Sequence, residues 1–103
     1  MIETVVIPLS EFVEIVMRFK RVRKTATANF AVIGRIRENA DCKEIIRIDN
    51  YLHRNKAGTH VHFFDKEKRK DGEQVEYLSE ITTPWEASQY VEKYLRNFYP
   101  DLL

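Results

Sequence analysis

Hydrophobic and polar residues alternate through the middle of the chain. The apolar members share one side of an extended backbone: Phe30, Val32, Gly34, Ile36, Ile46 and Ile48. A period of two is typical of strands with one buried face. The polar stretch 38–42 interrupts the pattern and predicts the loop of a β-hairpin. If Arg37 closes this loop opposite Lys43, Val32 lies opposite Ile48 on the core side.

The same register predicts a basic face on the other side of the hairpin. Its charged members are Arg35, Arg37, Arg47 and Asp49. From Arg18 to Arg37 the chain has seven basic residues and no acidic one, although its net charge is only +1. Charge effects reach about 10 Å in ordinary salt. This region can therefore attract a polyanion locally, or it can be a solvated strand face.

Residues 11–23 fit two structures. Strand spacing is shown by Val13, Ile15, Met17 and Phe19. Helical spacing is shown by Phe12, Val16 and Phe19, behind a Ser10 cap. We favour the strand, in which Arg18 and Lys20 join the basic face.

The C-terminal segment predicts a helix that begins at residues 83–86. Thr83 is the expected N-cap, Pro84 takes the first helical position and Glu86 closes a capping box. One apolar stripe follows at helical spacing: Ala87, Val91, Tyr94, Leu95 and Phe98. Pro100 ends the helix. Short strands are expected at 4–7 and 75–78, with a charged turn at 65–73.

These elements predict one α+β domain over residues 1–103. We expect a single antiparallel sheet of about four to five strands with the C-terminal helix packed on one face. No apolar run approaches the roughly 20 residues needed to cross a bilayer. The N-terminus lacks the basic start of a signal peptide, so we expect a cytoplasmic protein. The single cysteine, Cys42, excludes an internal disulfide and a sulfur-rich zinc site.

All three histidines fall within ten residues of one another. His60 and His62 are two apart, so they project from the same face of an extended segment. His53 lies across the loop 54–59. We expect these side chains to converge.

One interpretation of this segment is acid/base chemistry on RNA. His60 and His62, helped by His53, would move protons to and from the ribose and the leaving oxygen. Arg47 would bind the phosphate, because a guanidinium makes bidentate contacts with phosphate oxygens. Arg35, Asn50 and Lys56 would support it, and Asp49 would orient a histidine.

Two other interpretations remain open. His60 and His62, with His53 or Asp49 as third ligand, suit a zinc ion with one open position. Alternatively, Asp49 and Asn50 only cap a turn by bonding backbone amides, and the histidines fill an edge strand.

The segment 46–53, followed by His60, Val61 and His62, resembles the signature of the TumE-type toxins of prokaryotic toxin–antitoxin pairs. The matching positions are Arg47, Asp49, Asn50, His53, His60 and His62. Leu52 and Thr59 depart from it, standing where a proline and a further histidine are common. The order of parts over residues 11–99, strands before the motif and one helix after it, is also similar.

The resemblance implies a small growth-inhibiting toxin that a helix-turn-helix antitoxin neutralises. Our leading hypothesis is a toxin that acts on RNA, as a metal-independent ribonuclease using the histidine, arginine and aspartate cluster. The alternative is a non-catalytic module of the same fold that binds nucleic acid or an acidic protein. The sequence leaves a homodimer open.

Overall fold

The computed structural model describes residues 2–21, 27–52, 56–64 and 75–103. In order, the described elements are β1 (Ile2–Pro8), β2 (Val13–Arg21), β3 (Thr27–Glu38), β4 (Asp41–Asp49), β5 (His60–Phe63), β6 (Val75–Tyr77), α1 (Pro84–Phe98) and the 3₁₀ helix η1 (Pro100–Leu102). His53 and the predicted turn at 65–73 lie outside the described residues.

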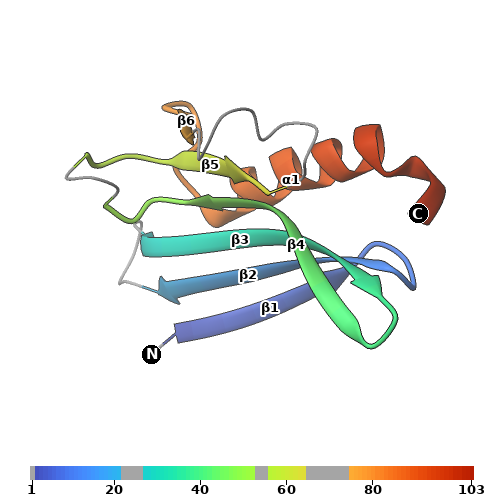
Figure 1. Cartoon of the computed structure of the whole chain (residues 1–103). Coiled ribbons are helices and arrows are strands. Elements are labelled where there is room, and N and C mark those ends of the chain that lie inside the picture. Colours follow the sequence, from blue (N-terminus) through green and yellow to red (C-terminus); the bar gives the residue numbers. More distant parts are fainter. Residues whose placement is uncertain (1, 22–26, 53–55, 65–74) are drawn as a thin grey trace.

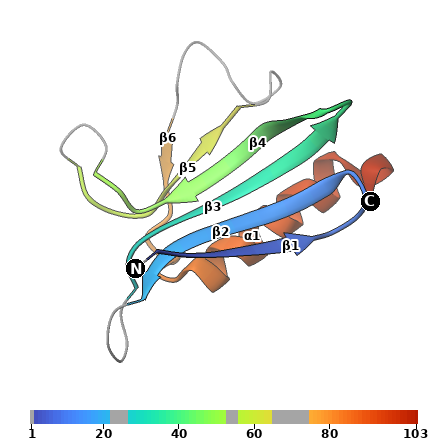
Figure 2. The same cartoon turned by 90° about the horizontal axis from the view of Figure 1, so that it is seen from below.

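The six described strands form one antiparallel sheet in the order β1 to β6 (Figures 1 and 2). The predicted α+β fold is confirmed, with one or two more strands than expected. The strands expected at 4–7 and 75–78 are observed as β1 and β6, and the strand beyond those expected is β5, which has only four residues. Among the described residues, no helix has the length and apolar character to span a membrane.

The strand prediction for residues 11–23 is confirmed by β2. Ser10 does cap, but it caps a turn: its hydroxyl accepts hydrogen bonds from the backbone N–H groups of Phe12 and Val13, each at 3.1 Å. The same hydroxyl donates to the carbonyl of Leu102 at 2.5 Å, which ties the β1–β2 turn to the C-terminal segment. Phe12 lies outside the strand and is half exposed.

The β3–β4 hairpin keeps the predicted core register but closes differently. Val32 lies opposite Ile48, as predicted, whereas Arg37 lies opposite Cys42 and not Lys43. The difference arises because the register shifts by one residue at a bulge next to Gly34, where Ile45 is the additional residue of β4. A bulge places two residues of one strand against one of its partner.

The hairpin tip is a two-residue turn at Asn39 and Ala40. Asn39 has a φ of 56°, in the left-handed region that asparagine tolerates better than most residues. The tighter turn shifts the strand pairing by one residue from the expected register, and the bulge at Ile45 shifts it back. The core pairing is therefore the same as in the simpler register.

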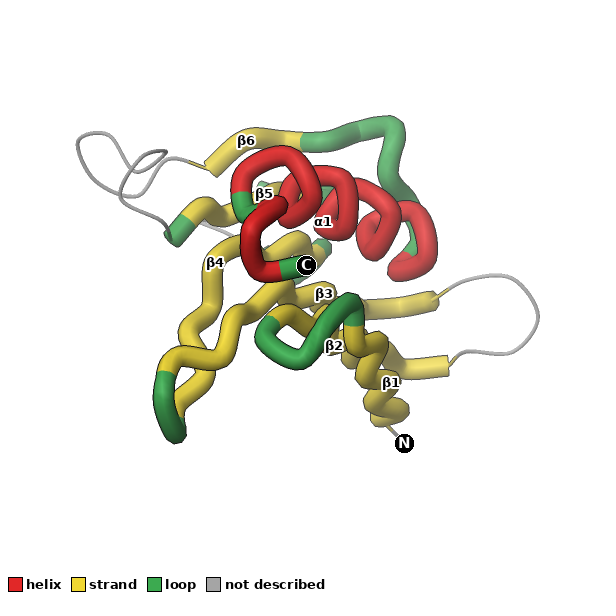
Figure 3. The backbone as a smooth tube through the Cα atoms, turned by 90° about the vertical axis from the view of Figure 1, so that its right-hand side faces the viewer, coloured by secondary structure: helices red, strands yellow, loops and turns green. Residues whose placement is uncertain are grey.

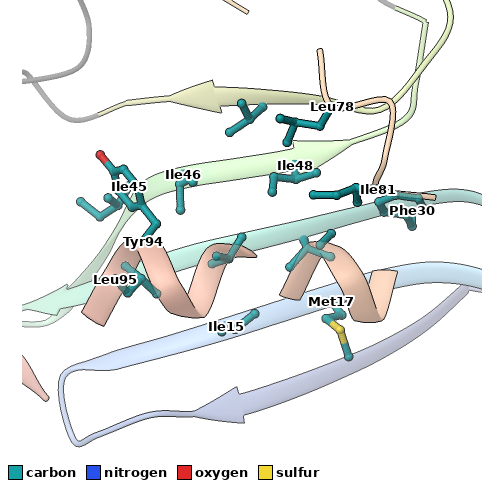
Figure 4. Packing of buried hydrophobic residues seen from close by; sticks show 14 of the residues in the cluster. Ile15, Met17, Phe30, Ile45, Ile46, Ile48, Leu78, Ile81, Tyr94 and Leu95 are labelled. Carbon is teal, nitrogen blue, oxygen red and sulfur yellow. The ribbon is translucent and has the colours of Figure 1, made fainter. Parts of the chain in front are cut away.

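Helix α1 lies on one face of the sheet (Figure 3), and the core lies between the two (Figure 4). Its largest fully buried side chains include Phe30, Ile15, Met17, Ile45, Ile46, Ile48 and Leu95. Gly34 on β3 lies directly under the helix. A Cβ at this position would be 2.7 Å from Val91 Cγ1, 2.8 Å from Ile46 Cγ2 and 3.1 Å from Leu95 Cδ1. The glycine permits the close approach of helix and sheet.

α1 begins as predicted, with Thr83 as N-cap and Pro84 at its first position. The Glu86 carboxylate accepts hydrogen bonds from the Thr82 backbone N–H at 3.2 Å and from the Thr82 and Thr83 hydroxyls at 3.1 Å. The Thr83 hydroxyl accepts from the Glu86 N–H at 3.2 Å. These bonds, that from the Thr82 backbone first, lower the pKa of Glu86 below its ordinary value of 4.5.

Gly34→Ala should lower the free energy of unfolding by about 1–3 kcal/mol, the usual cost of adding a methyl group to a filled core. The double variant Gly34→Ala/Val91→Ala removes the closest contacting group and should lose less than the sum of the two single variants. Urea titration of the four proteins measures the coupling, which we expect at about 0.5–3 kcal/mol. Additive losses would contradict close packing at Gly34.

Glu86→Gln should make the free energy of unfolding less dependent on pH under acidic conditions. Because the pKa of Glu86 is lower in the folded protein than its ordinary value of 4.5, its carboxylate stabilises the fold above that pH. The contribution is lost as the pH falls through the lowered pKa. Urea unfolding at several acidic pH values should show the wild type losing stability more steeply than the variant. Parallel curves would contradict the capping interaction.

Candidate functional site

The sheet face opposite α1 carries the polar residues that alternate with the core. On β4, Asp49 lies between Ala31 of β3 and His60 of β5. We call this surface the open face; its central residues are Arg18, Ala31, Ile33, Arg47, Asp49, His60 and His62. The neighbouring row pairs Arg47 with Ile33 and His62. Strand pairing therefore sets the carboxylate and the two imidazoles side by side.

The Asp49 carboxylate is the centre of this group. Its Oδ1 lies 3.2 Å from His60 Nε2, and its Oδ2 lies 3.6 Å from His62 Nε2. Oδ2 also accepts a hydrogen bond from Arg47 Nε at 3.2 Å, and Oδ1 accepts one from the Tyr51 backbone N–H at 3.1 Å. Asp49, Arg47, His60 and His62 form what we call the Asp49 cluster.

Three members of the Asp49 cluster are withdrawn from solvent. Asp49 is 4% exposed, His60 1% and His62 3%. Burying a charged or polar group is costly unless it is paired. The contacts within the cluster offset that cost, so its geometry is strongly determined.

Neighbouring groups fix the orientation of both rings. His60 Nδ1 lies 3.0 Å from the carbonyl oxygen of Gly58. The backbone φ of Gly58 is 123°, in the region that favours glycine. The His60 ring is edge-on to His62 with centroids 4.8 Å apart. The His62 ring stacks on Phe64 at 6.1 Å with an interplanar angle of 3°. The Nε2 atoms of both histidines consequently face Asp49.

Arg47 connects the buried cluster with solvent. Its side chain is 37% exposed, and the nitrogen that bonds Asp49 is Nε. The guanidinium carbon lies 5.7 Å from the centre of the Phe64 ring, within the range of a cation–π contact. The guanidinium is therefore held at the edge of the cluster and stays accessible.

A pocket of about 570 Å³ opens on this face. It is lined by Ile2, Arg18, Ala31, Ile33, Glu44, Arg47, Asp49, Tyr51, Leu52, His60 and His62. Its volume lies within the range of about 300–1,000 Å³ that is usual for small-molecule sites. The Asp49 cluster forms part of its wall, and the exposed side chain of Arg18 contributes a second positive charge.

The structure brings together four of the residues predicted for the site: Arg47, Asp49, His60 and His62. Their ligand atoms also define a potential metal position, because one atom each from Asp49, His60 and His62 lies within 4.8 Å of the others. His53, the third histidine of the zinc hypothesis, lies outside the described residues. Its part in the site remains a prediction.

The remaining predicted residues have other contacts. Arg35 Nη2 pairs with Glu14 Oε2 at 3.1 Å, and Arg35 is not among the residues of the pocket. Asn50 Oδ1 accepts a hydrogen bond from the Phe30 backbone N–H at 2.8 Å. Lys56 Nζ lies 4.0 Å from the centre of the Tyr77 ring. Of the turn-capping contacts considered from the sequence, Asp49 makes one, with the Tyr51 N–H, whereas the Asn50 side chain bonds the neighbouring strand β3.

Sequence reasoning missed three contributors to the site. Gly58 supplies the carbonyl that orients His60, Tyr51 lines the pocket, and Glu44 places a carboxylate there. The position of Gly58 two residues before His60 was only a weak sequence signal for its role. The other two depend on the path of residues 50–52 and on the bulge in β4.

Comparisons of the chain with protein-family models, with curated proteins and with solved structures give no match. The resemblance to TumE-type toxins therefore stays a prediction.

Proposed function

We propose that the open face binds RNA and that this protein is the toxin-like component of a toxin–antitoxin pair. The observation that carries the proposal is the pocket in which Arg18 and Arg47 flank the Asp49 cluster. Arginine is well suited to the phosphate backbone, because its planar guanidinium donates two parallel hydrogen bonds. The cognate partner would be a helix-turn-helix antitoxin, as the sequence resemblance implies.

The charge around the pocket favours a phosphate near Arg18 and Arg47 rather than along the whole face. Arg35 is neutralised by Glu14 at 3.1 Å, and the Glu44 carboxylate repels anions at its own side of the pocket. Tyr51 is 46% exposed and lines the same pocket. Stacking on aromatic rings combined with basic side chains is how many proteins bind single-stranded RNA.

RNA cleavage is the second candidate, and the Asp49 carboxylate favours it. A carboxylate that faces an imidazole nitrogen can hold the ring in the orientation that general acid/base catalysis needs. However, His60 and His62 are almost fully buried and both Nε2 atoms face Asp49. Direct proton transfer to RNA would need one ring to turn. The geometry therefore supports binding more strongly than metal-independent cleavage.

Arg18→Gln should weaken binding of a single-stranded RNA several-fold. Removal of one phosphate contact should also reduce the slope of log affinity against log salt by about 0.7–1. Fluorescence anisotropy across a salt series measures both quantities. Lys93→Gln is the matched control, because Lys93 is an exposed cation on α1 and its loss changes the net charge equally. Equal weakening by both variants would indicate only non-specific attraction.

The cleavage candidate predicts that His60→Ala and His62→Ala relieve the growth arrest caused by expression of the wild type. Purified variants should cleave RNA about 10²–10⁴-fold more slowly, the usual contribution of general acid/base catalysis, with RNA affinity little changed. Circular dichroism must show that both variants fold. Equal growth arrest by all three folded proteins would exclude the histidines as catalytic residues and leave the binding module.

A further inference from the structure

The donor atoms of Asp49, His60 and His62 lie close enough together to hold a metal ion. In a tetrahedral site with bonds of about 2.0–2.1 Å, adjacent ligand atoms lie roughly 3.4 Å apart. Asp49 Oδ1 lies 3.2 Å from His60 Nε2 and Asp49 Oδ2 lies 3.6 Å from His62 Nε2, so each imidazole is near this separation from a different oxygen of the carboxylate. All three donor atoms lie within 4.8 Å of one another. Two donors bound to one ion lie no more than about 4.2 Å apart, so the two rings and the carboxylate would close on the ion as it binds.

Groups outside the ligand set orient it as they do in established metal centres. His60 Nδ1 faces the Gly58 carbonyl at 3.0 Å, so a proton on Nδ1 leaves the Nε2 lone pair directed at Asp49. A metal-binding histidine commonly donates its other ring N–H in this manner. The carboxylate in turn accepts hydrogen bonds from Arg47 Nε and the Tyr51 N–H. Each of these contacts reduces the freedom of a donor.

The rival arrangement is a hydrogen-bonded cluster without metal. If His60 donates to Gly58 and also to Asp49, its ring must carry two protons. An ion bound at Nε2 satisfies the same carboxylate and leaves the ring neutral. One divalent cation therefore explains the side-chain contacts of Asp49 and the histidines equally as well as an additional proton on His60 would.

We propose that Asp49, His60 and His62 bind one zinc ion. Imidazole nitrogen with one carboxylate oxygen is a donor set that zinc favours, and three protein ligands leave a fourth position open. All three ligands line the pocket that contains Arg18 and Arg47, so the open position faces the proposed phosphate site. The zinc site extends the proposed function. Only the ligand expected at the open position, an RNA phosphate, rests on that proposal.

Zinc titration of the metal-free, tag-free protein by calorimetry tests the site. A Cys42→Ser background removes the exposed thiol. We expect one zinc per chain, and cobalt(II) in its place should give the visible absorption of four-coordinate metal. His62→Gln should weaken zinc binding more than roughly 100-fold, beyond the usual loss of an outer-shell partner. Glu44→Gln is the matched control, because this exposed pocket carboxylate lies outside the ligand set, and it should bind zinc like the wild type.

The titration contains no RNA, so the metal site and the RNA proposal can fail separately. His53→Ala should also bind zinc like the wild type, since Asp49 completes the ligand set. If His53→Ala loses as much zinc affinity as His62→Gln, the assignment of Asp49 as a ligand is overturned and a site of three histidines is favoured. No zinc uptake, or equal uptake by the folded His62→Gln variant, would overturn the site and leave the hydrogen-bonded cluster.

Discussion

In the part of the chain that the structure describes, helix α1 covers only one face of the sheet, and this asymmetry determines where the polar groups lie. Successive residues of a strand point to opposite faces, so burial of Ile46 and Ile48 under α1 sends Arg47 and Asp49 to the open face. A slip of one residue would place the Asp49 carboxylate in the apolar core, at a large cost in free energy. The core therefore fixes the register, and the register builds the Asp49 cluster.

The bulge at Ile45 divides the open face into two electrostatic regions. On the hairpin-tip side of the bulge, Arg35 lies between Glu14 on β2 and Glu44 on β4. It forms an ion pair with Glu14. On the side of the bulge away from the hairpin tip, the cross-strand neighbours of Arg47 are Ile33 and His62. Positive charge is thus balanced towards the hairpin tip and concentrated near Arg18 and Arg47. The additional residue Ile45 therefore lies between Arg35, which is held in an ion pair, and Arg47, which is available to a ligand.

The parts of the fold that depend on local pattern were predictable. Alternation identified β2, β3 and β4, and the Thr83, Pro84 and Glu86 signals located the start of α1. The bulge was not predictable, because it depends on how the β3–β4 pair curves under the helix. The partners of Asp49 were only partly predictable: the spacing of His60 and His62 gave their common face. Their contact with Asp49 requires the β4–β5 register, which the sequence pattern does not specify.

Stability alone does not explain the Asp49 cluster. Removing a carboxylate from water costs several kcal/mol, and replacing buried ionic groups by packed apolar residues is often neutral or stabilising. The adjoining residues Ile33 and Ala31 show that this face accepts apolar side chains. An apolar residue at position 49 would still allow Ile46 and Ile48 to pack under α1. A buried carboxylate, two oriented imidazoles and an accessible arginine beside one pocket are better explained by a ligand that needs all of them.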